Sequence, residues 1–444
     1  MSPLDAPAAA PRNTDLETAL TDARESYVTA RPKSAAAYER ARGVMPGGNT
    51  RSTLFYTPFP TVMEKGQGCY LHDIDGHDYL DLCGEYTAGL FGHSETRIIK
   101  AIEAAIGRGL NLAASGEREA VLAGILCARF PSIELVRFTN SGTEANLFAF
   151  SAARAFTGRQ RLLAMNGAYH GGMMTFAGGG SAVNAPFPVT LAPYNDIEAT
   201  RALIREQKDE IAAIIVEPMI GAGGCIPATR EFLQMLRDEA TAHNIVLTFD
   251  EVMTSRHSAG GLQRLHGITP DLTALGKYIA GGMSFGAFGG RKDIMSVYDP
   301  AHPKALPHGG TFNNNVLSMS AGVVAMGEIF DDAAADALRD RGEGLRNALN
   351  EVCRKHGVAM QFTGIGSMCQ PHFRAGPVER PYIQTPTEEG LRELFFLDLM
   401  AAGIYIARRG MVAMSLPVGE AECARYIAAV DAFCASRKPL FAGA

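Results

Sequence analysis

Residues 245–282, IVLTFDEVMTSRHSAGGLQRLHGITPDLTALGKYIAGG, contain two short apolar runs separated by a helix-length segment. The first run, 245–249, is followed by Asp250, and the second, 272–275, is followed by a Gly-Lys pair at 276–277. Alternation of apolar strands with helices predicts a mostly parallel sheet. Ligands of such sheets bind beyond the carboxyl ends of the strands, so we expect the functional residues directly after these runs.

The same alternation extends toward the N-terminus. Three further apolar runs occur at 135–139, 161–165 and 212–216, and amphipathic segments of helical length occur at 143–157 and 229–243. A sheet built from such strands is covered by helices on both faces. The central part of the chain is therefore predicted to be an α/β domain.

The pattern changes toward both ends of the chain. Residues 14–45 show helical periodicity that is broken at Pro32, and residues 61–82 read as short strands around a turn. Beyond the central part, we expect helices at 335–356, 387–402 and 419–436 and one Gly-rich strand at 360–368. We divide the chain into a disordered tip (1–13), an N-terminal segment that joins a small domain (14–85), a large domain (86–333) and a C-terminal small domain (334–444).

Composition and charge argue against several classes of protein. The chain has 444 residues, with 41 Lys and Arg against 47 Asp and Glu, which gives a net charge of −6. Binding to nucleic acids or to anionic membranes needs an excess of cations, so neither is expected as a partner. The eight cysteines form no CxxC pair, which argues against a disulfide framework or a zinc ribbon. We expect a cytoplasmic protein without a metal.

A phosphate-binding turn is expected after the run 135–139. There the sequence Asn-Ser-Gly-Thr-Glu-Ala-Asn, residues 140–146, leads directly into a helix. Ser141, Gly142 and Thr143 offer free backbone N–H groups, two hydroxyls and the positive end of the helix dipole. The alternative is a plain N-cap in which Glu144 complements the dipole. The motif alone leaves both interpretations open.

Aromatic and acidic residues follow three other strands. Tyr169 and His170 lie among glycines after the run 161–165, and the tyrosine could stack on a planar ligand. Glu217 and Asp250 each end an apolar strand, where a buried carboxylate needs a partner such as a protonated ring nitrogen. The alternative for the first pair is a packed tyrosine beside a core histidine.

Lys277 lies between an apolar strand and a Gly-rich turn. Partial desolvation there lowers the pKa of a lysine and frees its neutral amine for Schiff-base chemistry. A remote alternative is a serine hydrolase, because residues 282–286, GMSFG, match the nucleophile-elbow pattern around Ser284. Acids and histidines do follow, at Asp293, Asp299, His302 and His308, but the glycines at 286, 289 and 290 suit a hairpin better.

In combination, these motifs resemble a known family. NSGTEAN, GAYHG, VEP, FDEV and LGKYIAGG occur in this order, and the chain from Pro46 to about Ala435 resembles class III (ω-type) pyridoxal-phosphate aminotransferases. Within that family it is similar to the branch of glutamate-1-semialdehyde aminomutase and bacterial β-amino-acid (β-phenylalanine) aminotransferases. The resemblance implies the aspartate-aminotransferase-like fold, with a large domain that binds pyridoxal phosphate and a smaller α+β domain.

The resemblance also implies roles for individual residues. Lys277 would form the aldimine with pyridoxal phosphate, and Asp250 would pair with the pyridine nitrogen. Val252 and Tyr169 would cover the two ring faces. Thr311, in GGTFNNN, would reach the phosphate of the neighbouring subunit, which implies a homodimer with the active site at the interface. The other residues implied to bind the cofactor are Ser141, Gly142, Thr143, His170 and Glu217.

Two arginines are expected to bind substrate carboxylates. In the β-amino-acid branch, arginines at the positions of Arg51 and Arg409 do so, and the guanidinium fork suits this task. Tyr86 is expected beside them as a further substrate-binding residue, whereas Arg408 is expected to be a surface residue. The predicted reaction moves the amino group of an aromatic or aliphatic β-amino acid to 2-oxoglutarate or pyruvate. The alternative is intramolecular transfer of the aminomutase type.

Overall fold

The structure is a computed structural model that describes residues 15–110 and 112–443. The disordered tip expected at 1–13 lies outside the described residues. No described helix combines the length and the apolar character needed to cross a bilayer.

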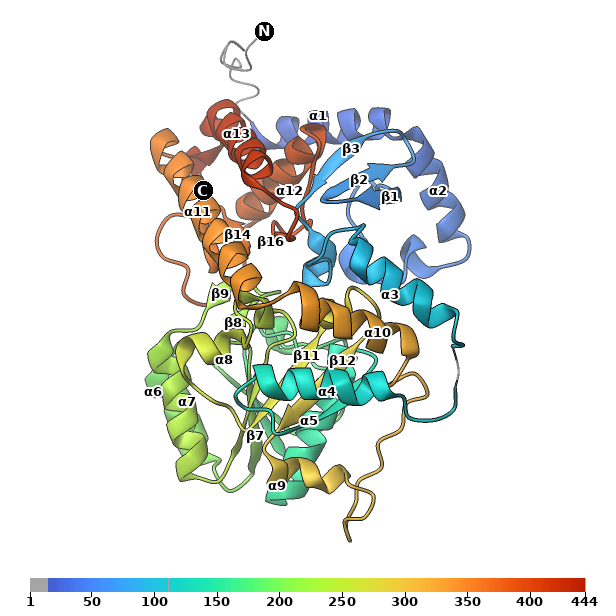
Figure 1. The fold of residues 1–444 in the computed structure, drawn as a ribbon. Coiled ribbons are helices and arrows are strands. Elements are labelled where there is room, and N and C mark those ends of the chain that lie inside the picture. The colour runs from blue at the N-terminus through green and yellow to red at the C-terminus, as the bar shows by residue number, and fades with distance from the viewer. Residues whose placement is uncertain (1–14, 111, 444) are drawn as a thin grey trace.

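A seven-stranded sheet forms the centre of the lower part of the molecule (Figure 1). In spatial order its strands are β4 (Leu135–Thr139), β12 (Gly286–Gly290), β11 (Leu272–Gly276), β10 (Val246–Asp250), β7 (Ile211–Val216), β5 (Arg161–Met165) and β6 (Val189–Ala192). All neighbours pair in parallel except β12, which is antiparallel to β4 and β11. The predicted mostly parallel sheet is confirmed. The edge strand β6 was not predicted, because it has only four residues, of which three are only partly buried.

Helices cover both faces of this sheet. In β7, Ala213 and Ile215 pack in one core cluster with alanines of α5 (Gly142–Thr157). The alternate residues Ile214 and Val216 belong to a second cluster with α7 (Arg230–Ala242), beside α6 (Ile197–Glu206). This period-two alternation is what a strand buried on both faces requires. The parallel pairing of β10 with β7 and with β11 places the carboxyl ends of these three strands along one edge.

Two smaller sheets bring the ends of the chain together. The first contains β1 (Met63–Gln67), β2 (Tyr70–Asp73), β3 (Asp78–Asp81) and β15 (Ile404–Tyr405), and the second contains β13 (Gln361–Ile365), β14 (Met368–His372) and β16 (Val412–Ala413). A two-stranded ribbon pairs β8 (Met219–Ile220) with β9 (Ile226–Pro227). The prediction of a single strand at 360–368 was wrong. Gly366, with φ +48°, turns the chain between β13 and β14, and glycine adopts such a conformation without steric cost.

The remaining helices complete the two parts of the molecule. They are α1 (Leu16–Ala30), α2 (Pro32–Arg42), α3 (Thr96–Ile106), α4 (Glu117–Arg129), α8 (Gly261–His266), α9 (Lys292–Met295), α10 (Val316–Val324), α11 (Asp332–His356), α12 (Pro386–Ala401) and α13 (Glu420–Arg437). Single turns are η1 (Pro46–Gly48), η2 (Ser52–Leu54), η3 (Gly84–Thr87), η4 (Ala177–Gly179), η5 (Thr254–His257), η6 (Lys277–Ala280), η7 (Ser296–Tyr298), η8 (Ala325–Ile329) and η9 (Lys438–Gly443). In Figure 1, α1, α11, α12 and α13 lie together above the large sheet.

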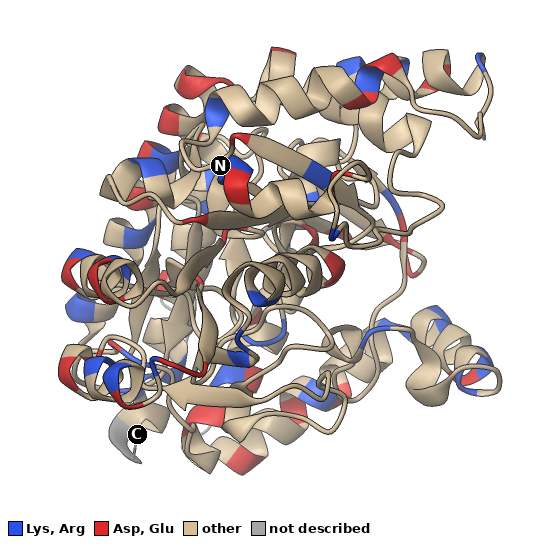
Figure 2. Cartoon of the chain, turned by 90° about the horizontal axis from the view of Figure 1, so that it is seen from below, with Lys and Arg blue, Asp and Glu red and all other residues tan. Residues whose placement is uncertain are grey.

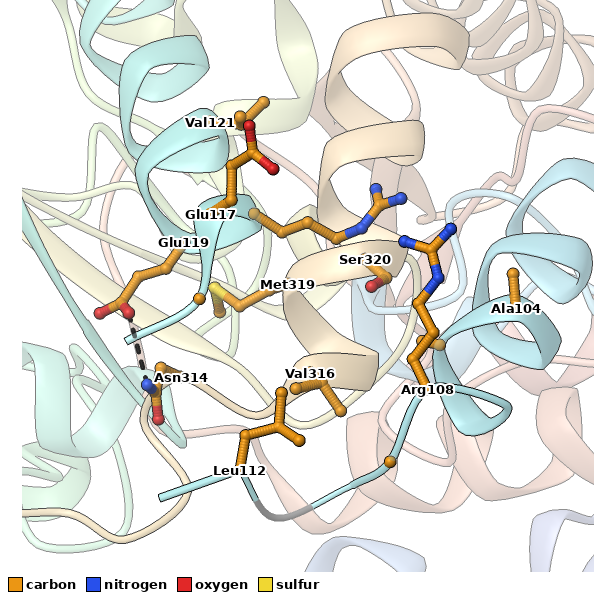
Figure 3. Close-up of a pocket in the computed structure, with 14 residues that line it drawn as sticks. Ala104, Arg108, Leu112, Glu117, Glu119, Val121, Asn314, Val316, Met319 and Ser320 are labelled. Carbon is orange, nitrogen blue, oxygen red and sulfur yellow. Dashed lines mark hydrogen bonds between the residues drawn. The ribbon is translucent and has the colours of Figure 1, made fainter. Parts of the chain in front are cut away.

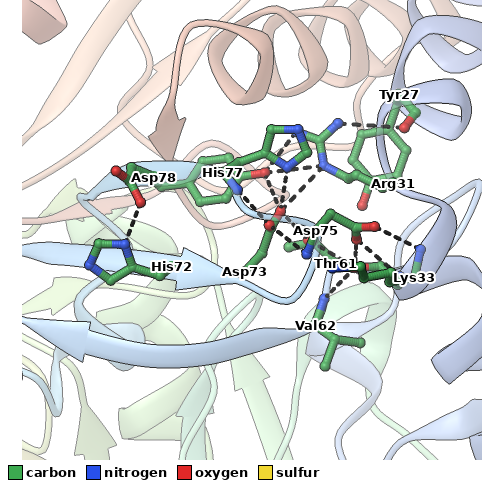
Figure 4. Close-up of polar contacts among 12 residues, drawn as sticks. Tyr27, Arg31, Lys33, Thr61, Val62, His72, Asp73, Asp75, His77 and Asp78 are labelled. Atoms are coloured by element: carbon green, nitrogen blue, oxygen red, sulfur yellow. Dashed lines mark hydrogen bonds and ion pairs between the residues drawn. The ribbon is translucent and has the colours of Figure 1, made fainter.

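Asp73 joins the N-terminal helices to the first small sheet (Figure 4). Its side chain is fully buried, and one carboxylate oxygen accepts hydrogen bonds from the Tyr79 hydroxyl at 2.7 Å, the His77 ring at 2.9 Å and the Thr61 hydroxyl at 3.2 Å. The other oxygen accepts two backbone N–H groups of the turn at 74–77. Arg31, between α1 and α2, donates to the Tyr79 hydroxyl at 2.8 Å. One buried acid therefore satisfies donors from three segments.

We expect Asp73→Ala to destabilise the protein by about 3 kcal/mol, because breaking a buried charged network leaves several donors without an acceptor. The thermal unfolding midpoint measures the effect. Asp78→Ala is the matched control, because its carboxylate is mostly exposed and contacts only the His72 ring; its effect should stay within about 0.5 kcal/mol. Equal thermal midpoints for the two variants would contradict the stabilising role of the buried Asp73 carboxylate.

Candidate active site

A cavity of about 430 Å³ lies at the edge of the large sheet where β7, β10 and β11 end. Twelve residues expected from the sequence to form the site line it: Arg51, Tyr86, Ser141, Gly142, Thr143, Tyr169, His170, Glu217, Asp250, Val252, Lys277 and Arg409. Thr311 does not line this cavity and is exposed. The structure therefore brings together side chains from segments that are far apart in the sequence.

The N-terminus of α5 forms one wall of the cavity. The Ser141 hydroxyl accepts the backbone N–H of Glu144 at 3.2 Å, so this serine is the N-cap of the helix. An N-cap and a phosphate-binding turn (the phosphate cup) are compatible at Ser141. The cap satisfies only one of the free backbone N–H groups at the start of α5, and the others stay available for a phosphate. A Cβ on Gly142 would lie 2.9 Å from both methyl groups of Val252, so only glycine fits there.

Asp250, at the end of β10, is buried and holds three donors. Its carboxylate accepts hydrogen bonds from Asn146 Nδ2 at 2.8 Å, His170 Nδ1 at 2.8 Å and the Val252 backbone N–H at 3.0 Å. The other ring nitrogen of His170 is buried without a partner among the described residues. Sequence reasoning missed Asn146, although it lies one helical turn after Thr143 on α5, where i and i+3 side chains share a face.

Glu217 is a second buried acid in the same wall. Its two carboxylate oxygens accept the backbone N–H groups of Tyr169 at 3.0 Å and Gly221 at 2.9 Å. Burial, with the nearby Asp250 charge, raises the pKa of Glu217 to about 7, although His170 opposes the shift. Near neutral pH this side chain can therefore donate as well as accept a hydrogen bond.

Lys277 starts the turn η6 directly after β11, with φ +56°. Its amine donates to the backbone carbonyl of Tyr86 at 2.5 Å. Burial and the positive charge of Arg409 lower the pKa of Lys277 to about 8, while Asp250 and Glu217 oppose the shift. A neutral, nucleophilic amine is therefore available close to physiological pH.

The two arginines flank Tyr86 at the mouth of the cavity. The guanidinium carbons of Arg409 and Arg51 lie 5.2 Å and 5.8 Å from the centre of the tyrosine ring. Arg51 forms an ion pair of 2.6 Å with Glu85, a residue that sequence reasoning missed. The Nε of Arg409 is buried without an acceptor in the part of the chain that the structure describes. Arg408 pairs instead with Glu393 at 3.0 Å.

Ser284 does not have the surroundings of a hydrolase nucleophile. It precedes the strand β12, whereas a nucleophile elbow leads from a strand into a helix. Its backbone carbonyl accepts a hydrogen bond from the Ser318 hydroxyl at 2.8 Å. The local backbone therefore gives no support to the hydrolase alternative.

The donor set fits pyridoxal phosphate. A helix N-terminus with serine and threonine hydroxyls suits a phosphate, and a buried carboxylate at Asp250 suits a protonated ring nitrogen. The buried amine of Lys277 suits an aldehyde. A Cβ on Gly171 would lie 2.2 Å from the Thr143 hydroxyl. Glycine is therefore needed for the segment at 171 to pack this closely against Thr143 at the phosphate-binding turn.

Comparisons with known proteins agree with this chemistry. A family profile described as Aminotransferase class-III matches residues 54–418. The beta-phenylalanine transaminase of Variovorax paradoxus is 48% identical over 418 residues, which cover 94% of this chain and 96% of that protein. The glutamate-1-semialdehyde 2,1-aminomutase of Methanocaldococcus jannaschii is 34% identical over 391 residues, with 84% and 91% covered.

Solved structures show the same relationship. The crystal structure of a novel beta-phenylalanine aminotransferase from Variovorax paradoxus has a TM-score of 0.94 and 47% identity, and the match covers 96% of this chain and 98% of that one. A transaminase with PLP bound has a TM-score of 0.84 and 32% identity, with 92% and 98% covered. The predicted fold class is confirmed.

We expect the amine of Lys277 to titrate near pH 8 in cofactor-free protein, where an ordinary lysine titrates near 10.5. Acetylation at a series of pH values, read by mass spectrometry of the Lys277 peptide, measures this pKa. The amine should react above about pH 8 and be protected by its proton below it. Arg409→Gln should move the midpoint to higher pH, because it removes a positive charge, and Arg408→Gln should not. A wild-type midpoint near 10.5 would contradict the burial argument.

Proposed function

This chain belongs to the class III aminotransferase family, and we propose that it transfers the amino group of a β-amino acid to a keto acid with pyridoxal phosphate as its cofactor. The observation that carries the proposal is the single cavity that contains the Lys277 amine, the Asp250 carboxylate and two arginines. The identity to a beta-phenylalanine transaminase, 48%, exceeds the 34% to an aminomutase, which favours transfer between two substrates.

The cofactor would be held by residues on three sides of the cavity. Ser141, Gly142 and Thr143 would bind its phosphate, Tyr169 and Val252 would lie against its ring, and His170 and Glu217 would complete the polar wall. When bound, pyridoxal phosphate supplies an aldehyde for the substrate amine and a ring that withdraws electrons from the amine-bearing carbon.

Asp250 and Lys277 would carry the chemistry of the protein itself. The anionic carboxylate of Asp250, fixed by Asn146 and His170, favours a proton on a ring nitrogen beside it. The neutral Nζ of Lys277 acts as a general base that takes the proton from the amine-bearing carbon of the donor.

The two arginines would bind the carboxylates of the two substrates in turn. A β-amino acid carries its carboxylate one carbon farther from the reacting nitrogen than an α-keto acid does. Arg51 therefore suits the carboxylate of an aromatic or aliphatic donor. Arg409 lowers the pKa of Lys277 and so lies within electrostatic reach of it, and it suits the carboxylate of 2-oxoglutarate or pyruvate. Tyr86, between the two guanidinium groups, would contact both substrates.

The active protein would be a homodimer in which Thr311 reaches the phosphate in the other subunit. Support comes from an apolar face around a cavity of about 400 Å³ between α3, α4 and α10 (Figure 3). Large apolar side chains are exposed there or next to it: Ile106, Leu110, Leu112, Val121 and Phe312. Patches of this kind mark protein interfaces. The Asn313 side chain accepts from Asn140 Nδ2 at 2.9 Å, which places this face beside the phosphate cup.

The division of the chain into a large and a small domain belongs to the same proposal. Residues 86–333 would form the large domain, and 14–85 would join 334–444 in the small one, as the parallel pairing of β15 with β3 supports. Figure 2 shows acidic and basic residues interspersed on the same helices, which suits a cytoplasmic enzyme with small substrates and without polyanionic partners.

We expect 3-amino-3-phenylpropanoate to bleach the visible absorbance of the bound cofactor, and a keto acid to restore it. Lys277→Ala should slow this cycle roughly 10²- to 10⁴-fold, because it removes the general base. Stopped-flow absorbance measures both steps. Turnover of glutamate-1-semialdehyde without any keto acid would favour the aminomutase instead. A colourless protein labelled at Ser284 by a serine-reactive phosphonate would favour a hydrolase.

For the dimer, light scattering should give about twice the 47.4 kDa of one chain. Phe312→Arg should shift the protein toward monomers, because it places a charge on the apolar face, and Ile383→Arg, at an exposed apolar residue that lines neither cavity, should not. Thr311→Val in the dimer should weaken cofactor binding about ten- to a hundredfold, the loss of one hydrogen bond to a charged group. A wild-type protein with the mass of one chain would exclude the arrangement.

A further inference from the structure

Arg51 has an internal carboxylate partner at the mouth of the cavity. Its Nη1 lies 2.6 Å from Oε1 of Glu85, and the two side chains are 45% and 55% exposed. Exposed ion pairs contribute little stability, because water solvates the separated charges almost as well. A carboxylate from a ligand can therefore replace Glu85 at small cost. A deeply buried pair could not be exchanged in this way.

The backbone places Glu85 in this position by an unusual conformation. The four residues of η3, Gly84, Glu85, Tyr86 and Thr87, all have positive φ, at 51°, 45°, 54° and 84°. Non-glycine residues adopt this region at a cost, and such strain concentrates at functional sites. A Cβ on Gly84 would also lie 2.5 Å from the backbone carbonyl of Ala413, so the segment is tightly held.

The same segment contacts every cationic group of the cavity mouth. Its Glu85 carboxylate pairs with Arg51, and the centre of the Tyr86 ring lies within 5.8 Å of both guanidinium carbons. The Tyr86 carbonyl accepts a hydrogen bond from the Lys277 amine. The two arginines differ, however. Arg409 has no carboxylate partner in the described structure and donates only to the Met411 sulfur at 3.2 Å. Among the described residues, Glu85 therefore neutralises Arg51, and Arg409 has no corresponding carboxylate.

The internal partner of Arg51 matters in a reaction with two substrates, because not every substrate brings a carboxylate to Arg51. In the proposed function, which this inference rests on, the donor carboxylate occupies Arg51 and the acceptor carboxylate occupies Arg409. When a monocarboxylic acceptor or a donor without a carboxylate is bound, Arg51 would face an uncharged group. An apolar ligand group that covers Arg51 displaces water from the guanidinium, so the unpaired charge becomes less favourable than it is in the open cavity. A counter-ion on the protein lowers this cost.

We propose that Glu85 is a built-in substitute for the substrate carboxylate. It neutralises Arg51 when the bound ligand does not, and it yields this arginine to the carboxylate of a β-amino acid. Glu85 is thus a specificity-determining residue. It moderates the affinity for carboxylates at Arg51 and lets the same pocket accept ligands that have none.

The test compares wild-type holoenzyme with Glu85→Gln, which keeps the size of the side chain and removes its charge. Calorimetry measures the binding of 3-phenylpropanoate, a carboxylate that has no amine and cannot react. Its dissociation constant should fall about two- to fivefold in the variant, because Arg51 no longer has a competing partner. With 1-phenylethylamine, a donor that has no carboxylate, kcat/KM should fall by a similar factor, since Arg51 is left unpaired.

Two further variants keep the result unambiguous. Glu85→Asp retains the charge. Its dissociation constant for 3-phenylpropanoate and its kcat/KM for 1-phenylethylamine should both stay close to the wild-type values. In an Arg51→Gln background, Glu85→Gln should have no effect on 3-phenylpropanoate binding, because the two residues act as a pair. An unchanged thermal midpoint shows that the Glu85→Gln variant is folded.

Wild-type values for both ligands in Glu85→Gln would overturn the proposal. So would a variant that favours both ligands, or one that disfavours both. Failure of the proposed function gives a different pattern. In that case no β-amino acid bleaches the wild-type cofactor, whereas the calorimetric comparison of 3-phenylpropanoate still reports on Glu85 and Arg51.

Discussion

The burial of one primary amine constrains the rest of this structure. An ammonium group removed from water is costly, so a buried lysine either loses its proton or stays among compensating groups. Lys277 does both in part. Its pKa falls to about 8 through burial and the Arg409 charge, while Asp250 and Glu217 limit the fall. The carboxyl edge of a parallel sheet supplies these neighbours, because β7, β10 and β11 all end there.

The two buried acids near this amine have different surroundings and therefore different capacities. Asp250 accepts hydrogen bonds from an amide, an imidazole and a backbone N–H. Glu217 accepts two backbone N–H groups, but burial raises its pKa to about 7. Glu217 can therefore exchange its proton near neutral pH, whereas three hydrogen-bond donors fix the position of the Asp250 carboxylate.

The sequence predicted the large sheet from local signals and, with the family resemblance, twelve of the 24 residues that line the cavity. Apolar runs and the polar residues that end them place Glu217, Asp250 and Lys277 at one edge without knowledge of the tertiary structure. Glu85 had no such signal. Its contact with Arg51 bridges 34 positions and depends on positive φ at residues that are not glycine. The turn between β13 and β14 was missed for the opposite reason, since the two glycines there, Gly364 and Gly366, obscured which one turns the chain.

The difference between the two arginines also affects the pKa of the Lys277 amine. Arg409 lowers the pKa of Lys277 through its unpaired charge, whereas Arg51 is already neutralised by Glu85. A carboxylate bound at Arg409 would cancel much of its field, and the Lys277 amine would then become a stronger base. Arg51 is not among the main groups that shift the pKa of Lys277, so a carboxylate bound there would change this pKa less. The donor and the acceptor would therefore meet the same lysine at different basicities, although no residue needs to move far to bring this about.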